Sequence, residues 1–227
     1  MTDLKSVAEQ ANRDLADATA HDILGWAHKT FGDRLVVTAS MADGALPYLA
    51  AQAAPGVDVV FLDTGYHFIE TIGTRDAVAA TLNVNLINVL PEQTVAEQDA
   101  TYGKDLFARD PDKCCALRKV APLNKALSGY DAWVTGVRRE ESPTRADTPV
   151  VDYDAKRNMV KLNPLAAWTS ADLESFIAEN GVLVNPLQYD GYPSIGCEPC
   201  TRRVAPGEDP RSGRWAGLAK IECGLHA

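Results

Sequence analysis

The pattern of apolar and polar positions changes at about residue 32. Before it, apolar side chains recur at helical spacing, which predicts one or two amphipathic helices ahead of Gly32. These positions are Leu4, Val7, Ala8, Leu15, Ile23, Leu24, Trp26 and Ala27. After it come four short apolar or β-branched runs bounded by turn residues, at 35–38, 57–62, 84–89 and 132–136. Such runs are typical of strands buried on both faces.

Stretches long enough for helices separate these predicted strands, at 43–54, 68–82 and 117–127. Strands that alternate with helices form βαβ units, in which the strands run parallel. We therefore predict an α/β fold with a mostly parallel central sheet flanked by helices. In such a sheet, ligands bind beyond the carboxyl ends of the strands.

The second half of the chain carries a different set of patterns. Two apolar runs, 150–151 and 159–162, are separated by a charged loop and predict a hairpin. Helix start residues at 169–172 and the stop Asn180-Gly181 predict a short helix between them. From Gly191 onward Gly, Pro and Arg become dense and the strand pattern ends, which indicates a looped lid or tail.

The length and composition are those of one folded domain. A chain of 227 residues with 46% hydrophobic residues can bury roughly 70% of its unfolded surface. We expect a single domain over 1–227, with leading helices at 1–31, an α/β core at 35–190, and a loop and tail at 191–227. The start lacks the features of a secretory signal and no apolar run is long enough to span a membrane. We therefore expect a cytoplasmic protein without a membrane partner.

The charge is acidic overall but basic in two segments. A net charge of −9 argues against a protein that coats nucleic acid, because phosphate neutralisation needs surplus Lys and Arg. Residues 113–145 nevertheless hold seven bases and three acids, and residues 197–220 hold five bases and three acids. Such segments can focus a small anionic ligand into a cleft. They can equally be two solvated loops.

Five cysteines fall into two tight doublets and one single residue: Cys114-Cys115, Cys197 with Cys200, and Cys223. In a reducing compartment such cysteines are more often metal ligands or catalysts than disulfides. Structural zinc, an iron–sulfur cluster and a redox dithiol all use C-x-x-C. Adjacent cysteines can hardly both fill tetrahedral zinc positions, so an iron–sulfur cluster is favoured over zinc, with ordinary buried cysteines as the alternative. Near the chain end, Cys223 can be a mobile nucleophile or an inert thiol.

Four linked motifs carry a resemblance to a known family. They are CCALRKVAPL at 114–123, WVTGVRREES at 133–142, IGCEPCTR at 195–202 and ECGLH at 222–226. From about Leu35 to the end, the chain resembles the assimilatory adenylyl-sulfate (APS) reductases of the phosphoadenylyl-sulfate (PAPS) reductase family. The resemblance implies an adenine nucleotide α-hydrolase-like fold with a mobile C-terminal tail, and it leans toward a homo-oligomer.

The resemblance also implies a two-step thiol reaction. Cys223 would attack the sulfur of APS and expel AMP, leaving an S-sulfocysteine. Thioredoxin, or glutaredoxin, would then release sulfite, as a step of sulfate assimilation for cysteine biosynthesis. Members that carry both cysteine doublets resemble APS users with one four-iron four-sulfur (4Fe–4S) cluster, here on Cys114, Cys115, Cys197 and Cys200. We expect that cluster to hold the site in place and add local electrostatics without carrying the electrons.

Family substrate contacts map onto basic and strand-end positions. Phosphosulfate contacts map onto Lys119, Arg211 and Arg214, and Arg138, Arg139 and, less securely, Arg145 fall in the arginine-rich loop. Adenosine contacts map onto Ser40, Leu62 and Gly136, although routine packing also explains the last two. The loop at 38–44 stands where related ATP-cleaving enzymes carry S-G-G-x-D-S, but it lacks those glycines. ATP hydrolysis is therefore not expected.

Three other readings stay open on the sequence. A PAPS-preferring reductase needs a further basic pocket for the 3′-phosphate. An ATP-pyrophosphatase-type RNA-thiolating enzyme shares the fold, but the acidic balance opposes it. A non-catalytic iron–sulfur sensor would make Cys223 incidental. No catalytic or ligand role is assigned to the histidines, although His226 of the terminal motif can orient the tail.

Overall fold

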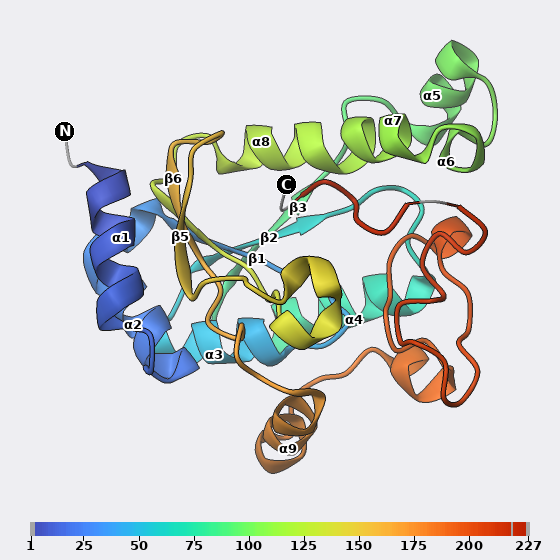
Figure 1. The fold of residues 1–227 in the computed structure, drawn as a ribbon. Helices are drawn as coiled ribbons and strands as arrows, with labels where there is room; N and C mark the ends of the chain where they lie inside the picture. Colours follow the sequence, from blue (N-terminus) through green and yellow to red (C-terminus); the bar gives the residue numbers. More distant parts are fainter. Residues whose placement is uncertain (1–2, 219, 226–227) are drawn as a thin grey trace.

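The computed structural model describes residues 3–218 and 220–225 and is built around one six-stranded sheet (Figure 1). The strand order is β3-β2-β1-β4-β6-β5, and every neighbouring pair is parallel except β5 with β6. The strands are β1 (Leu35–Thr38), β2 (Asp58–Leu62), β3 (Asn85–Val89), β4 (Ala132–Val134), β5 (Val151–Asp154) and β6 (Met159–Leu162). The predicted α/β class with a mostly parallel sheet is confirmed.

Helices cover both faces of this sheet (Figure 1). They are α1 (Leu4–Asp14), α2 (Ala20–Phe31), α3 (Ala45–Ala53), α4 (Ile69–Thr81), α5 (Val95–Tyr102), α6 (Leu106–Arg109), α7 (Pro111–Cys115), α8 (Ala121–Leu127) and α9 (Ser170–Asn180). The two leading helices, α3 and α4 match the sequence prediction within a few residues. Helices α5 and α6 were not predicted. No helix among the described residues is long and apolar enough to cross a membrane.

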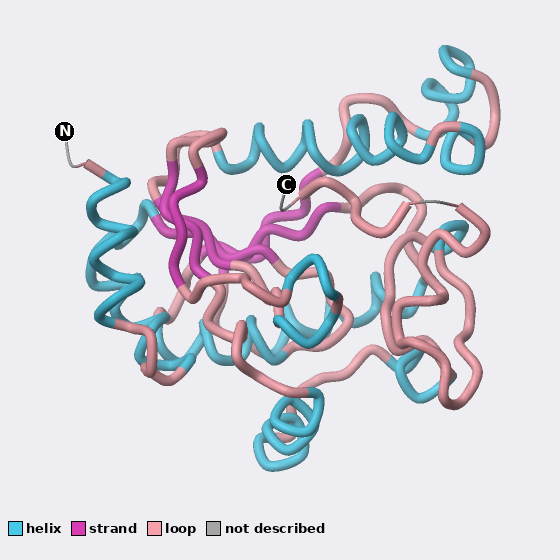
Figure 2. Tube along the Cα trace, viewed as in Figure 1, coloured by secondary structure: helices cyan, strands magenta, loops and turns pink. Residues whose placement is uncertain are grey.

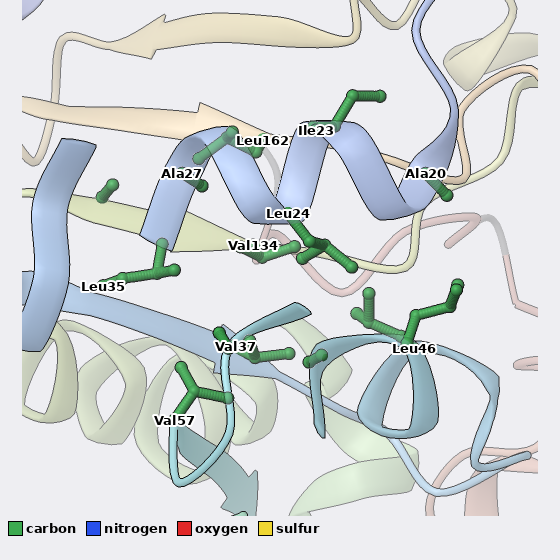
Figure 3. Close-up of a cluster of buried hydrophobic side chains, with 14 of the residues drawn as sticks. Ala20, Ile23, Leu24, Ala27, Leu35, Val37, Leu46, Val57, Val134 and Leu162 are labelled. Carbon is green, nitrogen blue, oxygen red and sulfur yellow. The ribbon is translucent and has the colours of Figure 1, made fainter. Parts of the chain in front are cut away.

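The larger core lies on the sheet face covered by α1, α2 and α3. Leu24 of α2, Leu46 of α3 and Val37 of β1 are all buried there (Figure 3). Successive strand residues point to opposite faces, so Val36 leaves this core and enters the one on the other side. The β1 run is therefore buried on both faces, as its unbroken apolar sequence predicts.

The second core lies under a long helical segment that carries the cysteine pair. Leu123 and Leu127 of α8 pack on Val36, Val60 and Trp133 of the sheet. The sequence prediction began this helix at residue 117, but the chain is already helical from 111, because an acceptor side chain caps α7 and Pro occupies its first position. A π-helix over Ala116–Val120 joins α7 to α8.

The π-helix has a local cause. Pro122, in the first turn of α8, has no N–H to give to the carbonyl four residues earlier, so the regular hydrogen-bond ladder breaks there. The insertion rotates the residues on either side of it relative to one another. The cysteine pair and Lys119 thus sit at the distorted part of an otherwise continuous helical segment.

The strand at 84–89 departs from the sequence prediction. β3 lies at the edge of the sheet and its residues are exposed or half-buried, so it is not buried on both faces. The exposed Asn85 and Asn88 suit such an edge better than a central position. By contrast the predicted hairpin is confirmed as β5 and β6, which pair antiparallel.

The predicted helix at the end of the core is confirmed as α9. Thr169 and Asp172 form a capping box at its start, and Gly181 ends it with a φ of 61°. Beyond Gly191 the described chain is mainly loop, with a single 3-10 turn at Glu198–Cys200 (Figure 2). Its last part returns beneath α7 and α8 towards the sheet (red in Figure 1).

Candidate active site

Both cysteine doublets line one pocket. Cys114 and Cys115 come from α7, Cys197 precedes the 3-10 turn and Cys200 ends it, and all four line the same pocket. Its walls also include Tyr66, Phe107, Pro111, Arg118, Lys119 and Trp215. The structure therefore brings together two cysteine doublets that lie 82 positions apart in the sequence, from Cys115 to Cys197.

These thiols are hard to ionise on their own. Burial, together with the neighbouring thiols, raises the pKa of Cys114 to about 12. The same two causes raise the pKa of Cys200 to about 11. Burial also raises the pKa of Cys115. Within residues 3–218 and 220–225, no three or more Cys, His, Asp or Glu side chains converge tightly enough to hold a single metal ion.

A buried arginine joins the two cysteine segments to the end of β2. Arg118 is 3% exposed and donates hydrogen bonds to the carbonyl of Thr64 and to Oε1 of Gln98, the latter over 3.1 Å. Thr64 Oγ1 in turn lies 3.3 Å from Sγ of Cys197. Arg118 was quoted in the motif but given no role. The available signal was a charged residue four positions after Cys114, on the pocket side of the helix.

Two cations predicted to bind substrate lie beside the pocket. Burial disfavours the charge of Lys119, but the nearby thiols of Cys197 and Cys223 outweigh it and raise its pKa. Burial lowers the pKa of Arg214, and the neighbouring charge of Arg211 acts in the same direction. The predicted trio of Lys119, Arg211 and Arg214 is thus gathered at one place.

Arg214 is held by a close backbone approach. Its Nη1 donates to Oγ of Ser194 over 3.2 Å and to the carbonyl of Ile195 over 3.3 Å. A Cβ on Gly196 would lie only 2.3 Å from the guanidinium. The absence of a side chain on Gly196 therefore leaves the space that the Arg214 guanidinium occupies.

The terminal thiol faces these cations. Cys223 is half-buried, and it acts electrostatically on Lys119, Arg214 and Cys115. Upstream of it, Lys220 pairs with Asp112 of α7. His226, to which the sequence allowed an orienting role, lies outside the described residues. The described part of the tail is docked against the cysteine pocket.

The remaining predicted contacts lie around the carboxyl ends of the central strands. Ser40 follows β1, Leu62 ends β2, and Gly136 follows β4. From β1 the chain adds β2 and β3 on one side and then crosses to add β4 on the other side of β1, and such a switch point is where open α/β sheets bind ligands. A Cβ on Gly136 would meet only a side-chain methyl at 3.7 Å, so steric crowding does not reserve that position for glycine.

The arginine-rich loop is held by local contacts. Arg138 donates to Oγ of Ser170 over 3.4 Å, and Arg139 donates to the carbonyl of Thr148 over 2.8 Å. Neither contacts the cysteine pocket, and the guanidinium of Arg139 is already bonded to a backbone carbonyl.

Burial raises the pKa of Asp43, which accepts a hydrogen bond from the N–H of Ala45 at the start of α3.

Comparison with known proteins gives a consistent picture. The model of the phosphoadenosine phosphosulfate reductase domain matches residues 34–203. A Streptomyces coelicolor protein named adenosine 5′-phosphosulfate reductase is 63% identical over 99% of this chain and 95% of its own length. A Mycolicibacterium smegmatis protein of the same name is 59% identical with the same coverage.

Solved structures agree on the fold. A phosphoadenylyl-sulfate reductase from Candida auris, in a phosphate complex, superposes with a TM-score of 0.75 at 26% identity, over 90% of this chain and 99% of its own. Yeast FAD synthetase shares the fold alone, with a TM-score of 0.56 at 16% identity, over 89% of this chain and 69% of its own. With a matching family model over most of its length and full-length relatives above half identity, the chain belongs to the phosphoadenosine phosphosulfate reductase family of oxidoreductases.

Proposed function

We propose that this protein reduces adenosine 5′-phosphosulfate to sulfite and AMP, with Cys223 as the nucleophile, as a step of sulfate assimilation. The observation that carries the proposal is the docked tail, in which the Cys223 thiol acts electrostatically on Lys119 and Arg214 while the adjacent Glu222 pairs with Arg211. The names of the full-length relatives support the choice of nucleotide.

The first step is a displacement at sulfur. The Cys223 thiolate attacks the sulfate sulfur, its S–S bond forms, and the bond from sulfur to the bridging phosphate oxygen breaks with its electron pair on oxygen. AMP leaves, and an S-sulfocysteine remains. Negative charge grows on the departing phosphate, so Lys119, Arg211 and Arg214 would stabilise the transition state more than the bound substrate.

The second step is a thiol exchange. A thiolate of reduced thioredoxin attacks Sγ of Cys223, sulfite leaves with the electron pair of the S–S bond, and a mixed disulfide forms. The second thioredoxin thiol then attacks that disulfide and returns Cys223 to its thiol form. Sulfur is reduced by two electrons and the thioredoxin dithiol is oxidised. A nucleophile on a tail suits this scheme because it must meet a nucleotide and then another protein.

The four pocket cysteines fit an iron–sulfur cluster. They are buried, soft donors whose raised pKa values disfavour thiolates unless a cation is present. Zinc would draw all four sulfurs to about 2.3 Å from one atom. A four-iron four-sulfur cluster is instead held by four cysteine thiolates, the number that line this pocket.

The pocket also offers donors that lack a protein partner. Nε1 of Trp215 and Nε of Arg214 are buried without a hydrogen-bond partner in the structure. Such donors suit the sulfur atoms of a cluster or the oxygens of a bound anion. When bound, the cluster would supply local charge and hold the two cysteine segments together, while the thiols carry the electrons.

We propose the remaining substrate contacts at the ends of the central strands. The adenosine would lie over the strand ends at Ser40, Leu62 and Gly136. The charge of Arg138 acts on Asp43 beside the β1 loop, which indicates that Arg138 lies nearer to this region than Arg139 does. Arg139 is the weaker candidate, since its guanidinium already serves the carbonyl of Thr148.

The decisive experiment is an intact mass without reductant. The holoprotein is mixed with adenosine 5′-phosphosulfate, and a sulfonate-sized mass increase is expected on the peptide that contains Cys223. The variant Cys223→Ser should show no increase and no turnover, with the absorbance of the bound cluster unchanged. A sensor in which Cys223 is incidental would give no adduct in either protein, and that result would refute the proposal.

A separate experiment must distinguish one competing substrate. The Candida auris neighbour is a phosphoadenylyl-sulfate reductase, so the 3′-phosphorylated nucleotide is the nearest alternative. Sulfite release from the two nucleotides is compared at equal concentration. We expect the unphosphorylated nucleotide to be preferred, and a preference for the 3′-phosphorylated one would overturn that part of the proposal.

A further inference from the structure

We propose that the two residues flanking the Cys223-Gly224 turn dock the tail: Glu222 as an ionic latch on Arg145, and Leu225 as an apolar anchor under α8. Both are positioning residues, since each acts through the placement of the thiol. Their role in the reaction rests on the proposed function of Cys223, whereas the docking itself does not.

The latch is a two-pronged ion pair. Nε and Nη2 of Arg145 each donate to a different carboxylate oxygen of Glu222, both over 2.9 Å. Thr144 Oγ1 adds a third donor at 3.2 Å. The side chains are 13% and 27% exposed, so this pair is better shielded than most surface ion pairs. Bidentate charge-assisted pairs of this kind fix geometry as well as adding stability.

The same carboxylate reaches the expected phosphosulfate arginine. Nη2 of Arg211 lies 3.5 Å from Oε2 of Glu222, and it donates to the carbonyl of Ile221 over 3.1 Å. Glu222 thus connects the arginine-rich loop with the loop that carries Arg211. Glu222, the residue before Cys223, is therefore held between two basic segments.

The anchor lies on the opposite side of the thiol. Leu225 is partly buried against the second core, which includes Leu123, Leu127, Trp133 and Met159. Its carbonyl also accepts a long hydrogen bond, 3.4 Å, from Arg157. Arg157 is itself fixed by Asp154 over 2.6 Å and by Asn124 over 2.8 Å. The tail end is therefore seated on a preformed surface of α8 and the β5–β6 hairpin.

The glycine between the thiol and the anchor makes the turn. Gly224 has a φ of 78°, a conformation that costs other residues about 1 kcal/mol or more. It also passes close to the helix, since a Cβ there would meet Val120 at 3.8 Å. This turn lets Glu222 and Leu225 point to different partners while Cys223 faces the cations. Beside Gly224 lies a groove of about 340 Å³ along Asn124, Lys156 and Arg157.

Docking at both flanks has a consequence for the two-step reaction. The docked tail places the thiol for attack on a nucleotide, and the same contacts shield it from a second protein. Release of the latch and the anchor then exposes Cys223. Neither contact is large, so together they suit a reversible dock.

The test is the alkylation rate of Cys223 in the holoprotein without nucleotide, followed by peptide mass. Leu225→Ala should raise the rate about tenfold, because roughly half of a leucine burial is lost. Leu225→Met should stay near the parent, since it conserves volume. The matched control is Ile221→Ala, which removes a side chain that is 65% exposed, and it should change the rate less than twofold.

The latch is tested by charge. Glu222→Gln should raise the rate about fivefold, and Arg145→Gln should do the same, with the double variant no faster than either single one. Added salt should speed alkylation of the parent more than that of Glu222→Gln, which keeps only the Lys220–Asp112 pair of the tail. Equal rates in Leu225→Ala, Ile221→Ala and the parent would overturn the anchor, and additive latch variants would overturn the latch.

A second readout connects docking to the reaction. In single-turnover S-sulfonation, Leu225→Ala should lower the maximal rate and leave the nucleotide KM within about twofold, because the contact is not to the nucleotide. Alkylation needs no nucleotide, so it judges the docking even if adenosine 5′-phosphosulfate forms no adduct on Cys223. An adduct at the parent rate in every variant would instead leave the proposed function standing and overturn the positioning role.

Discussion

The two ends of the chain are held to the same sheet by different forces. Residues 4–31 fold chiefly as helices α1 and α2, and α2 buries Ile23, Leu24 and Ala27 in the larger core, with exposures of 1% or less. The last described residues form no helix or strand and are docked chiefly by ion pairs, one glycine turn and one partly buried leucine. Apolar burial favours one permanent arrangement, whereas a few polar contacts allow a reversible one.

The difference in packing matches the role of each part of the chain. A core that positions strand ends must not move, because the substrate would move with it. A nucleophile that meets two partners must move, and its contacts are accordingly few. The cysteine pocket lies between these extremes, with buried thiols joined to the sheet through Arg118 and Thr64.

The largest effect is expected from a substitution in the N-terminal helices, which are held by apolar burial. Leu24→Ala removes a fully buried side chain that packs near Val37 and Leu46 (Figure 3), and it should lower the free energy of unfolding by about 3 kcal/mol. For a chain of this size the melting temperature should fall by about 6–12 °C. Calorimetry of the holoprotein measures it. The alkylation rate of Cys223 should stay within twofold of the parent below the transition, and a large increase would mean that the two ends are not separable.

An effect of intermediate size is expected at the contact between Gly196 and Arg214. Gly196→Ala would put a Cβ 2.3 Å from the guanidinium, so Arg214 must shift. A misplaced cation should lower the first-step rate by about 10- to 100-fold while the melting temperature changes by only a few degrees. Gly73→Ala is the matched control, since nothing lies within 4 Å of a Cβ there. Equal activity of the two variants would show that Arg214 does not need its present position.

The smallest effect tests the loop after β1. Burial raises the pKa of Asp43 above its ordinary 3.8, with the charge of Arg138 opposing and that of Glu141 reinforcing the shift. The folded state therefore holds a proton that the unfolded state releases, and stability falls as pH rises from 3.8 through the raised folded pKa. Asp43→Asn keeps an acceptor for the N–H of Ala45 and cannot ionise.

The variant should consequently melt higher than the parent at neutral pH, by about 2–4 °C for each kcal/mol gained. Its advantage should shrink as the pH approaches 4. Thermal melts across that range measure the difference. A constant offset at every pH would mean that ionisation of Asp43 has no part in it.

Local pattern was enough for much of the fold. The unbroken apolar run of β1 predicted burial on both faces because strand side chains alternate, and Val36 and Val37 do enter different cores. The capping residues of α9 predicted its start and stop because their hydrogen bonds are local. The edge position of β3 was missed, since strand order is a long-range property that an apolar run does not encode.

The features of the candidate site also divide into those that local sequence determined and those that tertiary packing decided. The sequence alone determined most of the strands and helices, the pairing of cysteines into doublets and the isolation of Cys223, because each depends on neighbours in the chain. Only the tertiary structure decided that the doublets share a pocket, that Thr64 reaches Cys197 across 133 positions, and that Arg145 reaches Glu222 across 77. Such contacts depend on how separate elements pack around a common sheet, and side chains far apart in sequence carry no local periodicity that announces their meeting.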